Sequence, residues 1–365
     1  MKPPISPPAA APKATKSRGG KSVNLRDIAK HAKVSIATVS MVLNENPRIS
    51  RPTQLRVQRL INQMGYRPNR LAQSLSSKFT RVLACLLPAL RHGFADAYFG
   101  ELISGVCDRA GKLGYKVMLE QAKPDFVRER EHVEIFERRY VDGLLCLGFN
   151  DRHQFLADFE GDRYPFIMVD NHSGQYDLDH VMCDYRGGAE QVMNYLLQLG
   201  HRKIALITGA PEAFTARDVI HMYEQKLRAA GTEPLPTMRA DGRFTENGGA
   251  KAAEMILEKH PDITAVFAGN DKMALGAMHQ LRRRGLSIPQ DVSVVGFDDL
   301  GHSAFVYPSL TTVHLPLYEV GTLSCERLIE RIHGKVDRVA ERLPTHLVVR
   351  DSTAMARSVD MPAPR

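Results

Sequence analysis

The sequence predicts two kinds of fold in one chain: an N-terminal all-α helix-turn-helix headpiece followed by a hinge, then an α/β body of two doubly wound parallel-sheet lobes. Three observations predict this arrangement. Capped, short helical patterns fill residues 23–68, and the charge of the chain changes sign near residue 80. Beyond that point, short apolar runs alternate with helix-length amphipathic segments, which is typical of βαβ units.

The first two helices are defined by their capping residues. Asn24 precedes a helix predicted over Leu25–Ala32, and Asp27 completes a capping box and puts a negative charge at the positive helix end. Ser35 begins a second helix that runs to Val42. Only about three residues therefore separate the two helices, the tight connection that a helix-turn-helix motif requires.

The second helix is expected to expose small or flexible side chains. Ser50 caps a third helix, which Gly65 and Pro68 end, and the three helices bury one apolar face through Ile28, Ala29, Val34, Val39, Leu43, Val57, Leu60, Ile61 and Met64. The side chains left toward a partner are those of Ser35, Ile36, Ala37, Thr38, Ser40 and Met41. They suit a helix in a DNA major groove, where hydroxyls reach phosphates or base edges and apolar tips meet thymine methyl groups. An ordinary helical mini-domain is the alternative interpretation of this pattern.

The distribution of charge favours a nucleic-acid partner. Residues 1–80 hold 15 of the 49 lysines and arginines but two of the 41 acids, a balance of +13, whereas the rest of the chain carries −5. The net charge of +8 thus combines a basic headpiece with a mildly acidic body, the electrostatic pattern of a nucleic-acid-binding protein.

Composition excludes several other classes. Apolar residues make up 43% of the chain and charged residues 25%, and no apolar run approaches the roughly 18 residues of a membrane span. Residues 1–22 lack the apolar core of a secretory signal and are interpreted as a disordered basic tail, which either adds weak phosphate attraction or is inert. The five scattered cysteines fit reduced thiols in the cytoplasm, where the protein is expected to associate with the nucleoid.

The body is predicted to contain parallel strands separated by helices. The apolar run at 81–88 comes first, and further strands are expected at 116–120, 143–147, 166–170, 181–184, 203–208, 265–268 and 292–296. A helix over 99–113 shows clear helical spacing and is expected to form part of the dimer face. About 270 residues exceed one comfortable core, so two lobes are expected.

Several segments in the right order resemble the lactose-repressor and galactose-repressor family of bacterial transcription regulators. They are LRDIAKHAKVS, TVSMVLN, MGYRPNRLAQSL, YVDGLL, GHRKIALITG, NDKMALGAM, VSVVGFDD and LTTV, and the resemblance spans about residues 23–351. It implies a headpiece at 23–68, a hinge at 69–80, and an effector-binding and dimerisation body at 81–351. Its lobes are predicted as 81–184 plus 300–316 and 185–299 plus 317–351, with a tail at 352–365.

Two headpiece residues depart from the family pattern. Lys33 stands in the turn where the family usually has Gly, and Met41 stands where it usually has Arg. An arginine could donate two hydrogen bonds to guanine, whereas a thioether offers only apolar contact. Less preference for guanine at that base step is therefore expected, within a DNA-contacting set that also includes Asn44.

The segment 69–77 is too short for a stable isolated helix, since helices below roughly 12–15 residues are marginal in water. The resemblance implies a hinge helix that folds when two copies meet in the minor groove, with Leu75 as an apolar wedge between bases. Its expected DNA contacts are Asn69, Arg70, Ala72 and Leu75, where Arg70 reaches phosphate and Ala72 permits close helix approach. A plain polar linker is the alternative.

Effector binding is expected in the cleft between the lobes, at the carboxyl ends of the strands. Arg217 lies near a helix start, where a cation is disfavoured unless an anionic or polar group faces it, and the resemblance implies that it holds effector oxygens. Asn270 and Asp271 follow the strand at 265–268, and Asp170 ends the strand at 166–170. Either aspartate could instead be a cap.

An aromatic corner, Tyr98 and Phe99, is implied to stack on a sugar, although Phe99 could be partly core. The loop at 92–97 is longer than usual in the family. Val219 replaces a polar group found in many relatives, so a less polar pocket is expected.

The resulting prediction is a dimeric, sequence-specific DNA-binding regulator, a repressor, that binds a pseudo-palindromic operator under control of a sugar or sugar derivative. No leucine heptad follows residue 352, so a dimer rather than a tetramer is expected. No cofactor, metal, membrane partner or catalytic role is expected, because no P-loop, GxSxG, HExxH or CxxC occurs. A solute-binding protein would need an export signal, and an enzyme a phosphate loop or catalytic pair.

Overall fold

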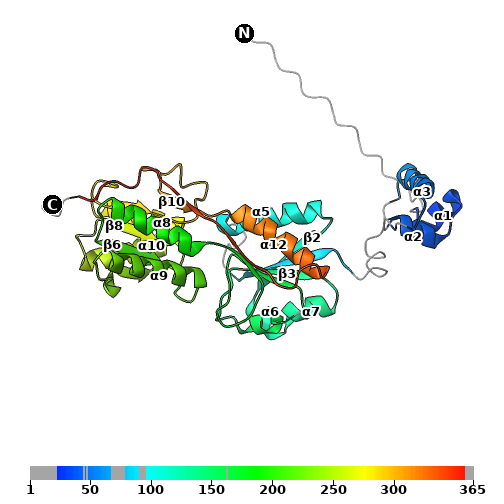
Figure 1. Cartoon of the computed structure of the whole chain (residues 1–365), viewed down its shortest axis with the longest axis horizontal. Helices are drawn as coiled ribbons and strands as arrows, with labels where there is room; N and C mark the ends of the chain where they lie inside the picture. The colour runs from blue at the N-terminus through cyan, green and yellow to red at the C-terminus, as the bar shows by residue number, and fades with distance from the viewer. Residues whose placement is uncertain are drawn as a thin grey trace, which may run out of the picture. The chain divides into compact units, whose positions relative to one another are not determined.

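The computed structural model describes residues 23–43, 46, 48–66, 79–89, 96–161 and 163–357. The chain divides into two compact units, Met1–Lys78 and Phe79–Arg365 (Figure 1). The first is the headpiece and the second is the body.

The headpiece consists of three short helices, as predicted: α1 (Leu25–Ala32), α2 (Ile36–Leu43) and α3 (Arg51–Gln63). Asn24 accepts hydrogen bonds from the backbone N–H groups of Arg26 and Asp27, and the Asp27 carboxylate accepts one from the Asn24 backbone, so the capping box is confirmed. The core is small and aliphatic, with Ile28, Ala29, Ala32, Val39, Val42, Val57 and Ile61 buried.

Two details of the headpiece differ from the prediction. Val34, in the turn between α1 and α2, and Leu43, the last residue of α2, are only partly buried, as are Leu60 and Met64, whereas Ala32 and Val42 lie in the core. Ser50 occupies the cap position of α3, but its hydroxyl bonds to the Thr53 hydroxyl at 3.1 Å and makes no bond to the helix backbone.

Lobe 1 is built on a six-stranded, fully parallel sheet with the order β11-β5-β4-β3-β1-β2. The strands are β1 (Val82–Pro88), β2 (Lys116–Ala122), β3 (Gly143–Leu147), β4 (Phe166–Val169), β5 (His180–Cys183) and β11 (Ala340–Leu343). The central strands are buried on both faces, which explains their continuous apolar sequences.

Helices cover both faces of this sheet (Figure 1). One face packs against α5 (Ala97–Lys112) and α12 (Leu317–Ile332), which lie side by side. The other carries α6 (Pro124–Arg128), α7 (Glu131–Glu137) and the 3-10 helix η2 (Gln154–Phe159) over an aromatic-rich core.

Lobe 2 repeats the plan with a four-stranded parallel sheet of order β7-β6-β8-β9. Its strands are β6 (Ile204–Thr208), β7 (Arg239–Asp241), β8 (Ala265–Ala268) and β9 (Ser293–Val295). One face packs against α8 (Tyr185–Gln198) and α9 (Phe214–Ala229), and the other against α10 (Glu246–Lys259) and α11 (Asp271–Arg283). A 3-10 turn, η3 (Pro236–Met238), precedes β7.

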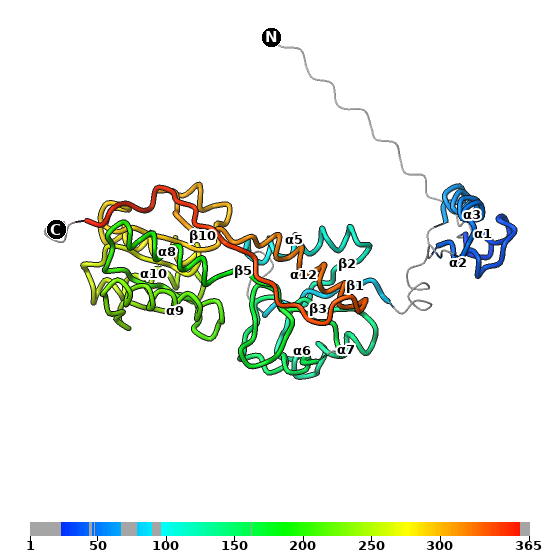
Figure 2. The backbone as a smooth tube through the Cα atoms, viewed as in Figure 1, coloured from blue at the N-terminus to red at the C-terminus, as the bar shows by residue number. Residues whose placement is uncertain are grey.

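Three crossings of the chain connect the lobes. The first follows β5, and the other two include the antiparallel pair β10 (Thr312–His314) and β12 (His346–Val348). Figure 2 shows the late segment of the chain returning from lobe 1 to lobe 2. The two lobes are thus discontinuous in sequence.

The predicted division of the chain between the lobes was wrong. Residues 300–316 were assigned to lobe 1, but Leu310 lies in the lobe 2 core and Thr311 bridges to β9. Residues 317–351 were assigned to lobe 2, but α12 packs on α5 and β11 pairs with β5. The cause is physical: the crossings come at β10 and β12, which are too short to leave a sequence pattern.

The predicted tail at 352–365 also needs correction. Ser352 is fully buried, and its hydroxyl donates to the Val294 carbonyl at 2.6 Å. Ala354 and Ala356 donate backbone hydrogen bonds to the Ser293 hydroxyl and the Leu199 carbonyl, respectively. Residues 352–357 therefore belong to lobe 2, where backbone and hydroxyl bonds, rather than apolar side chains, hold them.

The strands predicted from apolar runs are all confirmed to within two residues. The strands that sequence analysis missed, β7, β10, β11 and β12, have three or four residues and are partly polar.

Within the described ranges, no helix is both long and apolar enough to cross a membrane.

Candidate functional site

The exposed face of α2 is the first candidate site. Ile36 and Met41 are exposed, at 44% and 40%, although both are apolar, while Val39 and Val42 on the opposite side are buried. Ala37 is exposed, and Thr38 and Ser40 are partly exposed. Apolar tips and hydroxyls on one short helix can meet base edges in a major groove.

The hydroxyl of Ser35 is already engaged. It accepts a hydrogen bond from the backbone N–H of Thr38 at 3.0 Å and bonds to the Thr38 hydroxyl at 2.9 Å. Ser35 therefore caps α2 and fixes its first turn. The other predicted DNA contacts, Asn44, Asn69, Arg70, Ala72 and Leu75, lie outside the described residues.

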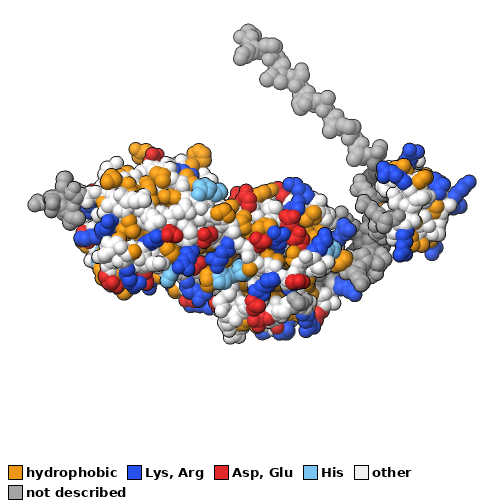
Figure 3. Space-filling model, in the orientation of Figure 1, with side chains coloured by type: hydrophobic (Ala, Val, Ile, Leu, Met, Phe, Trp, Pro, Cys, Tyr) orange, Lys and Arg blue, Asp and Glu red, His pale blue; other side chains and the backbone are white. Residues whose placement is uncertain are grey.

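Lys33 adopts a left-handed backbone conformation, with φ 52° and ψ 47°, between α1 and α2. This explains why glycine suits the turn, because a side chain there costs about 1–2 kcal/mol. The visible face of the headpiece carries lysine and arginine side chains among uncharged ones, whereas the body mixes both signs (Figure 3).

The second candidate site is a cavity of about 530 Å³ between the lobes. Its walls come from segments that follow β1, β3 and β4 of lobe 1 and β6, β7, β8 and β9 of lobe 2. These are the carboxyl ends of parallel strands, where open α/β sheets bind ligands. The cavity combines aromatic walls, Tyr98, Phe99, Tyr185 and Phe244, with polar groups that include Asn150, Asn171, Asn270 and Asp298.

Asp170 lines this cavity, but three donors of the protein already bond to its carboxylate. The hydroxyls of Tyr98 and Tyr185 each donate to it at 2.6 Å, and the Cys183 backbone N–H donates at 2.8 Å. Burial and the charge of Asp170 raise the pKa of both tyrosines well above its usual value. Asp170 therefore fixes the two aromatic walls as neutral phenols.

Phe99 lines the cavity but is only 7% exposed and packs into the lobe 1 core. Val219, predicted to make the pocket less polar, is a buried core residue of α9 that does not border this cavity.

Asn270 and Asp271 have different positions although they are neighbours. Asn270 lines the cavity and caps α11 by accepting from the Met273 N–H at 2.8 Å. Asp271 is fully buried, accepts from the Thr312 and Ser303 hydroxyls at 2.5 Å and the Leu300 N–H at 3.0 Å, and does not border the cavity. Its prediction as an effector ligand is not supported, because these donors use both oxygens. Burial raises its pKa to about 6.

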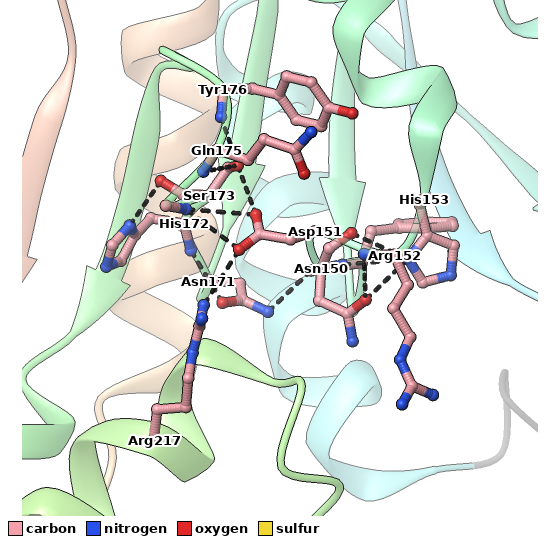
Figure 4. Close-up of polar contacts among 12 residues, drawn as sticks. Asn150, Asp151, Arg152, His153, Asn171, His172, Ser173, Gln175, Tyr176 and Arg217 are labelled. Carbon is pink, nitrogen blue, oxygen red and sulfur yellow. Dashed lines mark hydrogen bonds and ion pairs between the residues drawn. The ribbon is translucent and has the colours of Figure 1, made fainter.

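Arg217 does not line the cavity either. Its guanidinium group bonds to Asp151 of lobe 1 at 3.1 Å, so the anionic partner predicted for it is a side chain of the protein (Figure 4). The sequence placed Arg217 correctly at a helix start but could not show which lobe 1 group it meets.

Sequence analysis missed Asp298, which is 6% exposed and lines the cavity with a positive φ of 124°. Burial, and then Asp271, Asp170 and Asp96, raise its pKa well above the usual range. Within the described part of the chain, no hydrogen-bond donor to its carboxylate is observed. The sequence did indicate this position, because Asp298 follows the strand predicted at 292–296, in the segment VSVVGFDD.

Two further cavity residues were missed. Lys272 of α11 pairs at 2.6 Å with Asp96, the cap of α5, across the two lobes. Phe244 follows Arg243, and both residues have positive φ. The Phe244 ring covers Gly209 so closely that a Cβ on Gly209 would lie 1.8 Å from the ring.

Among the described residues, no group of three or more His, Cys, Asp or Glu is placed to hold a metal ion.

A helix-turn-helix headpiece joined to a two-lobed α/β body with a cavity at its strand ends defines a DNA-binding regulator with a ligand-binding-type domain. Comparisons with known proteins agree. Residues 24–69 match the model of bacterial regulatory proteins of the lacI family, and residues 193–353 match the periplasmic binding protein-like domain.

Full-length relatives show the same organisation. The chain is 31% identical over 335 residues to the HTH-type transcriptional repressor CytR of Escherichia coli, covering 91% of this chain and 96% of the relative. It is 32% identical over 332 residues to the ribose operon repressor of Halalkalibacterium halodurans, covering 90% and 96%. The chain belongs to the lacI family of bacterial regulatory proteins.

Solved structures are similar over nearly the whole chain. The lac repressor dimer bound to operator and the anti-inducer ONPF matches with a TM-score of 0.77 and 27% identity, covering 92% of this chain and all of that one. The complex of the transcriptional regulator CelR with cellobiose matches with a TM-score of 0.70 and 29% identity, covering 90% and 99%.

Proposed function

We propose that this regulator is a repressor that binds a pseudo-palindromic operator as a homodimer, with its DNA affinity controlled by a sugar or sugar derivative in the cavity between the lobes. The observation that carries the proposal is the exposed face of α2 in a basic headpiece, because apolar and hydroxyl side chains without a core role need a partner. A protein acting on DNA would work in the bacterial cytoplasm.

In this proposal α2 lies in the major groove with Ser35, Ile36, Ala37, Thr38, Ser40, Met41 and Asn44 toward the DNA. Asn69, Arg70, Ala72 and Leu75 act in the minor groove as a hinge helix. Met41 gives an apolar contact where an arginine would bond to guanine, so the half-site has less guanine preference at that step.

For the effector, the cavity chemistry favours a neutral ligand rich in hydroxyl groups. Asp298 and Asn270 offer a carboxylate and an amide to sugar hydroxyls, and the Phe244, Tyr98 and Phe99 rings offer faces or edges for stacking. Three carboxylates, Asp96, Asp170 and Asp298, and two cations, Arg243 and Lys272, line the cavity, so its formal charge does not favour an anionic ligand. Asn270 and Asp298 are therefore our proposed ligands, while Asp170 acts by positioning Tyr98.

Dimerisation is supported by exposed apolar surface. Phe305 and Tyr307, in the segment that follows β9, are 89% and 91% exposed, which is unusual for aromatic side chains. We propose this segment, together with the outer face of α5, as the homodimer contact. Two headpieces held at a fixed spacing could then reach both half-sites of an operator.

Effector control follows from the two lobes. A ligand that binds one lobe arrangement better than another shifts the population toward it, and a coupling of about 1–3 kcal/mol is typical. A modest rotation of the lobes would change the spacing of the two headpieces and thereby the affinity for an operator.

The experiment that tests the DNA function is selection of bound fragments from random duplex DNA by the full-length protein at two salt concentrations. We expect a pseudo-palindrome and a steep loss of affinity with salt, because phosphate contacts release counterions. Sequence-independent binding with the same salt dependence would contradict the proposal.

The same selection with Met41→Arg should restore guanine at one step of each half-site, while Lys33→Gly serves as a control that leaves the selected sequence unchanged.

Effector binding is tested separately by thermal unfolding of the full-length protein with panels of neutral sugars and sugar acids. We expect neutral sugars to raise Tm and Asp298→Asn to abolish the rise. Conversion of any of these compounds to product would instead support an enzyme.

A further inference from the structure

An ion pair between Arg217 and Asp151 joins the two lobes. Arg217 extends from the first turn of α9 in lobe 2, and Asp151 lies in the loop after β3 in lobe 1, 3.1 Å away (Figure 4). Neither side chain lines the cavity. The pair therefore connects the walls of the cavity without contacting its interior.

Lobe 1 holds Asp151 in position for this contact. One carboxylate oxygen accepts from the Ser173 hydroxyl at 2.5 Å and the Gly174 N–H at 3.2 Å. The other accepts from Arg217 at 3.1 Å and, at the longer distance of 3.4 Å, from the same Gly174 N–H. Burial alone would raise the pKa of Asp151, but the hydrogen bonds from Ser173, Arg217 and Gly174 outweigh it and lower the pKa. Asp151 is thus a fixed anion near neutral pH.

A second ion pair lies beside the first with the opposite polarity. Arg152, the neighbour of Asp151, bonds to Glu212, which lies just before α9. Each lobe therefore presents one cation and one anion to the other. The His172 ring, in the neighbouring lobe 1 loop after β4, also contacts the Phe214 ring in the first turn of α9.

The segments that carry these contacts also form the cavity wall. Asn150 and Asn171, next to Asp151 and His172, line the cavity from lobe 1, while Ala213 and Thr215 flank Phe214 and line it from lobe 2. Alternate residues thus face the cavity and the opposite lobe. Any shift of these segments on ligand binding would be transmitted to the ion pairs.

We propose that Arg217–Asp151 and Arg152–Glu212 form a clasp between the lobes that holds the cavity closed without ligand, and that Arg217 is a positioning residue for lobe closure rather than an effector ligand. The clasp belongs to the body alone and does not rest on the proposed DNA or sugar function. Because its side chains are partly exposed, its strength depends on salt.

The size of the effect follows from this exposure. Arg217 is 47% exposed, and an ion pair of this kind changes an equilibrium by about two- to five-fold. Arg217→Gln and Asp151→Asn should each reduce the ratio of closed to open protein by about that factor. Arg217→Glu, which places two anions opposite each other, should reduce it further, and Arg217→Lys should retain most of it.

The experiment measures the distance between spin labels on the two lobes of one chain of the full-length protein, without DNA or ligand, with labelled chains diluted in an excess of unlabelled protein. Tyr140→Cys and Met255→Cys provide exposed labelling sites on lobe 1 and lobe 2, in a Cys107→Ser background that removes the exposed native thiol. We expect one main distance at low salt, and a second population in Arg217→Glu or in unmutated protein at about 1 M salt. Salt should have a smaller effect on Arg217→Gln than on the unmutated protein, because only the remaining inter-lobe pairs, Arg152–Glu212 and Lys272–Asp96, are left to screen.

Arg163→Gln is the matched control, because Arg163 is an exposed arginine that pairs with Glu137 inside lobe 1, at 3.3 Å. It should leave the distances unchanged. A distance distribution for Arg217→Glu identical to that of the unmutated protein, at low and high salt, would overturn the clasp. Since neither DNA nor effector takes part, this result is independent of the proposed function.

Discussion

Lobe 1 and lobe 2 share one architecture but bring different chemistry to the cavity between them. Each has a parallel sheet covered by helices, and in each a pair of helices packs closely through glycines: Gly105 and Gly321 in lobe 1, Gly249 and Gly276 in lobe 2. At the cavity, however, Asp170 of lobe 1 accepts from three donors of the protein, one of which is Tyr185 at the start of α8, whereas lobe 2 presents Asp298 with no observed donor among the described residues.

This difference teaches that residue type and strand-end position do not determine the role of a buried carboxylate. Asp170 stabilises the wall of lobe 1 because three donors offset its desolvation. Asp298 keeps its desolvation cost and remains available to a ligand. A site in which one wall is internally satisfied and the other is not can bind tightly while reorganising little.

The largest expected effect tests the shared architecture. An added Cβ would lie 2.1 Å from the Leu102 carbonyl in Gly321→Ala and 1.9 Å from the Glu246 carbonyl in Gly276→Ala, so each helix pair must separate. We expect either variant to lose about 3 kcal/mol of unfolding free energy, measured by urea denaturation.

Gly111→Ala is the control for these variants, since nothing lies within 4 Å of its added Cβ and alanine favours the helix by about 1 kcal/mol. Equal tolerance of alanine at positions 321 and 111 would show that the helix contact is not close-packed.

The second effect tests the carboxylate of lobe 1. In Asp170→Asn, the amide oxygen can still accept from the Cys183 N–H, but the amide nitrogen takes the place of the oxygen that accepts from both tyrosine hydroxyls. Two hydrogen bonds to a charged acceptor are therefore lost, and the hydroxyls must turn to accept from a neutral amide. We expect a loss of about 2 kcal/mol of unfolding free energy. Asparagine tolerates the left-handed backbone at this position, φ 51°, so strain would not explain the loss. An unchanged free energy of unfolding in Asp170→Asn would contradict the positioning role of Asp170.

The third effect has the opposite sign and concerns the carboxylate of lobe 2. Removing the desolvated charge of Asp298 should stabilise the ligand-free protein, and we expect Asp298→Asn to gain about 1 kcal/mol near pH 8. Differential scanning calorimetry of both proteins without ligand measures it. A loss of stability would mean that Asp298 has a stabilising role that its surroundings do not reveal.

The same variant has a defined pH dependence. Because burial and the neighbouring acids raise the folded-state pKa of Asp298 above its unfolded value, its favourable contribution is complete below about pH 4 and is lost as pH rises through the folded-state pKa. The advantage of Asp298→Asn should therefore be larger at pH 8 than at pH 5. Asp271, with a pKa of about 6, is one of the acids that raise the pKa of Asp298, so the difference between the two proteins includes the loss of this repulsion.

The smallest expected effect compares strain in the two lobes. Arg243 beside the cavity and Arg139 in lobe 1 both have positive φ, 52° and 56°. Replacing either by glycine should gain about 0.5–1 kcal/mol, since glycine removes the left-handed cost but loses chain entropy. A gain for Arg139→Gly without one for Arg243→Gly would show that the Arg243 side chain stabilises the cavity wall by a comparable amount.

The sequence by itself determined the local features of this protein. The capping box of Asn24 and Asp27, the three headpiece helices and the buried strands depend on residues within a few positions of one another, so their patterns are visible in the chain. The charge division between headpiece and body is likewise a property of the sequence alone.

Only the tertiary structure decided which residues meet. Asp271 turned inward to Ser303 and Thr312, Arg217 met Asp151, and Asp298 was left in the cavity, although all lie near strand ends as expected. The lobe boundaries and residues 352–357 also depend on short polar pairings between distant segments. Such contacts are set by the packing of the whole body, and no local pattern of hydrophobicity or charge encodes them.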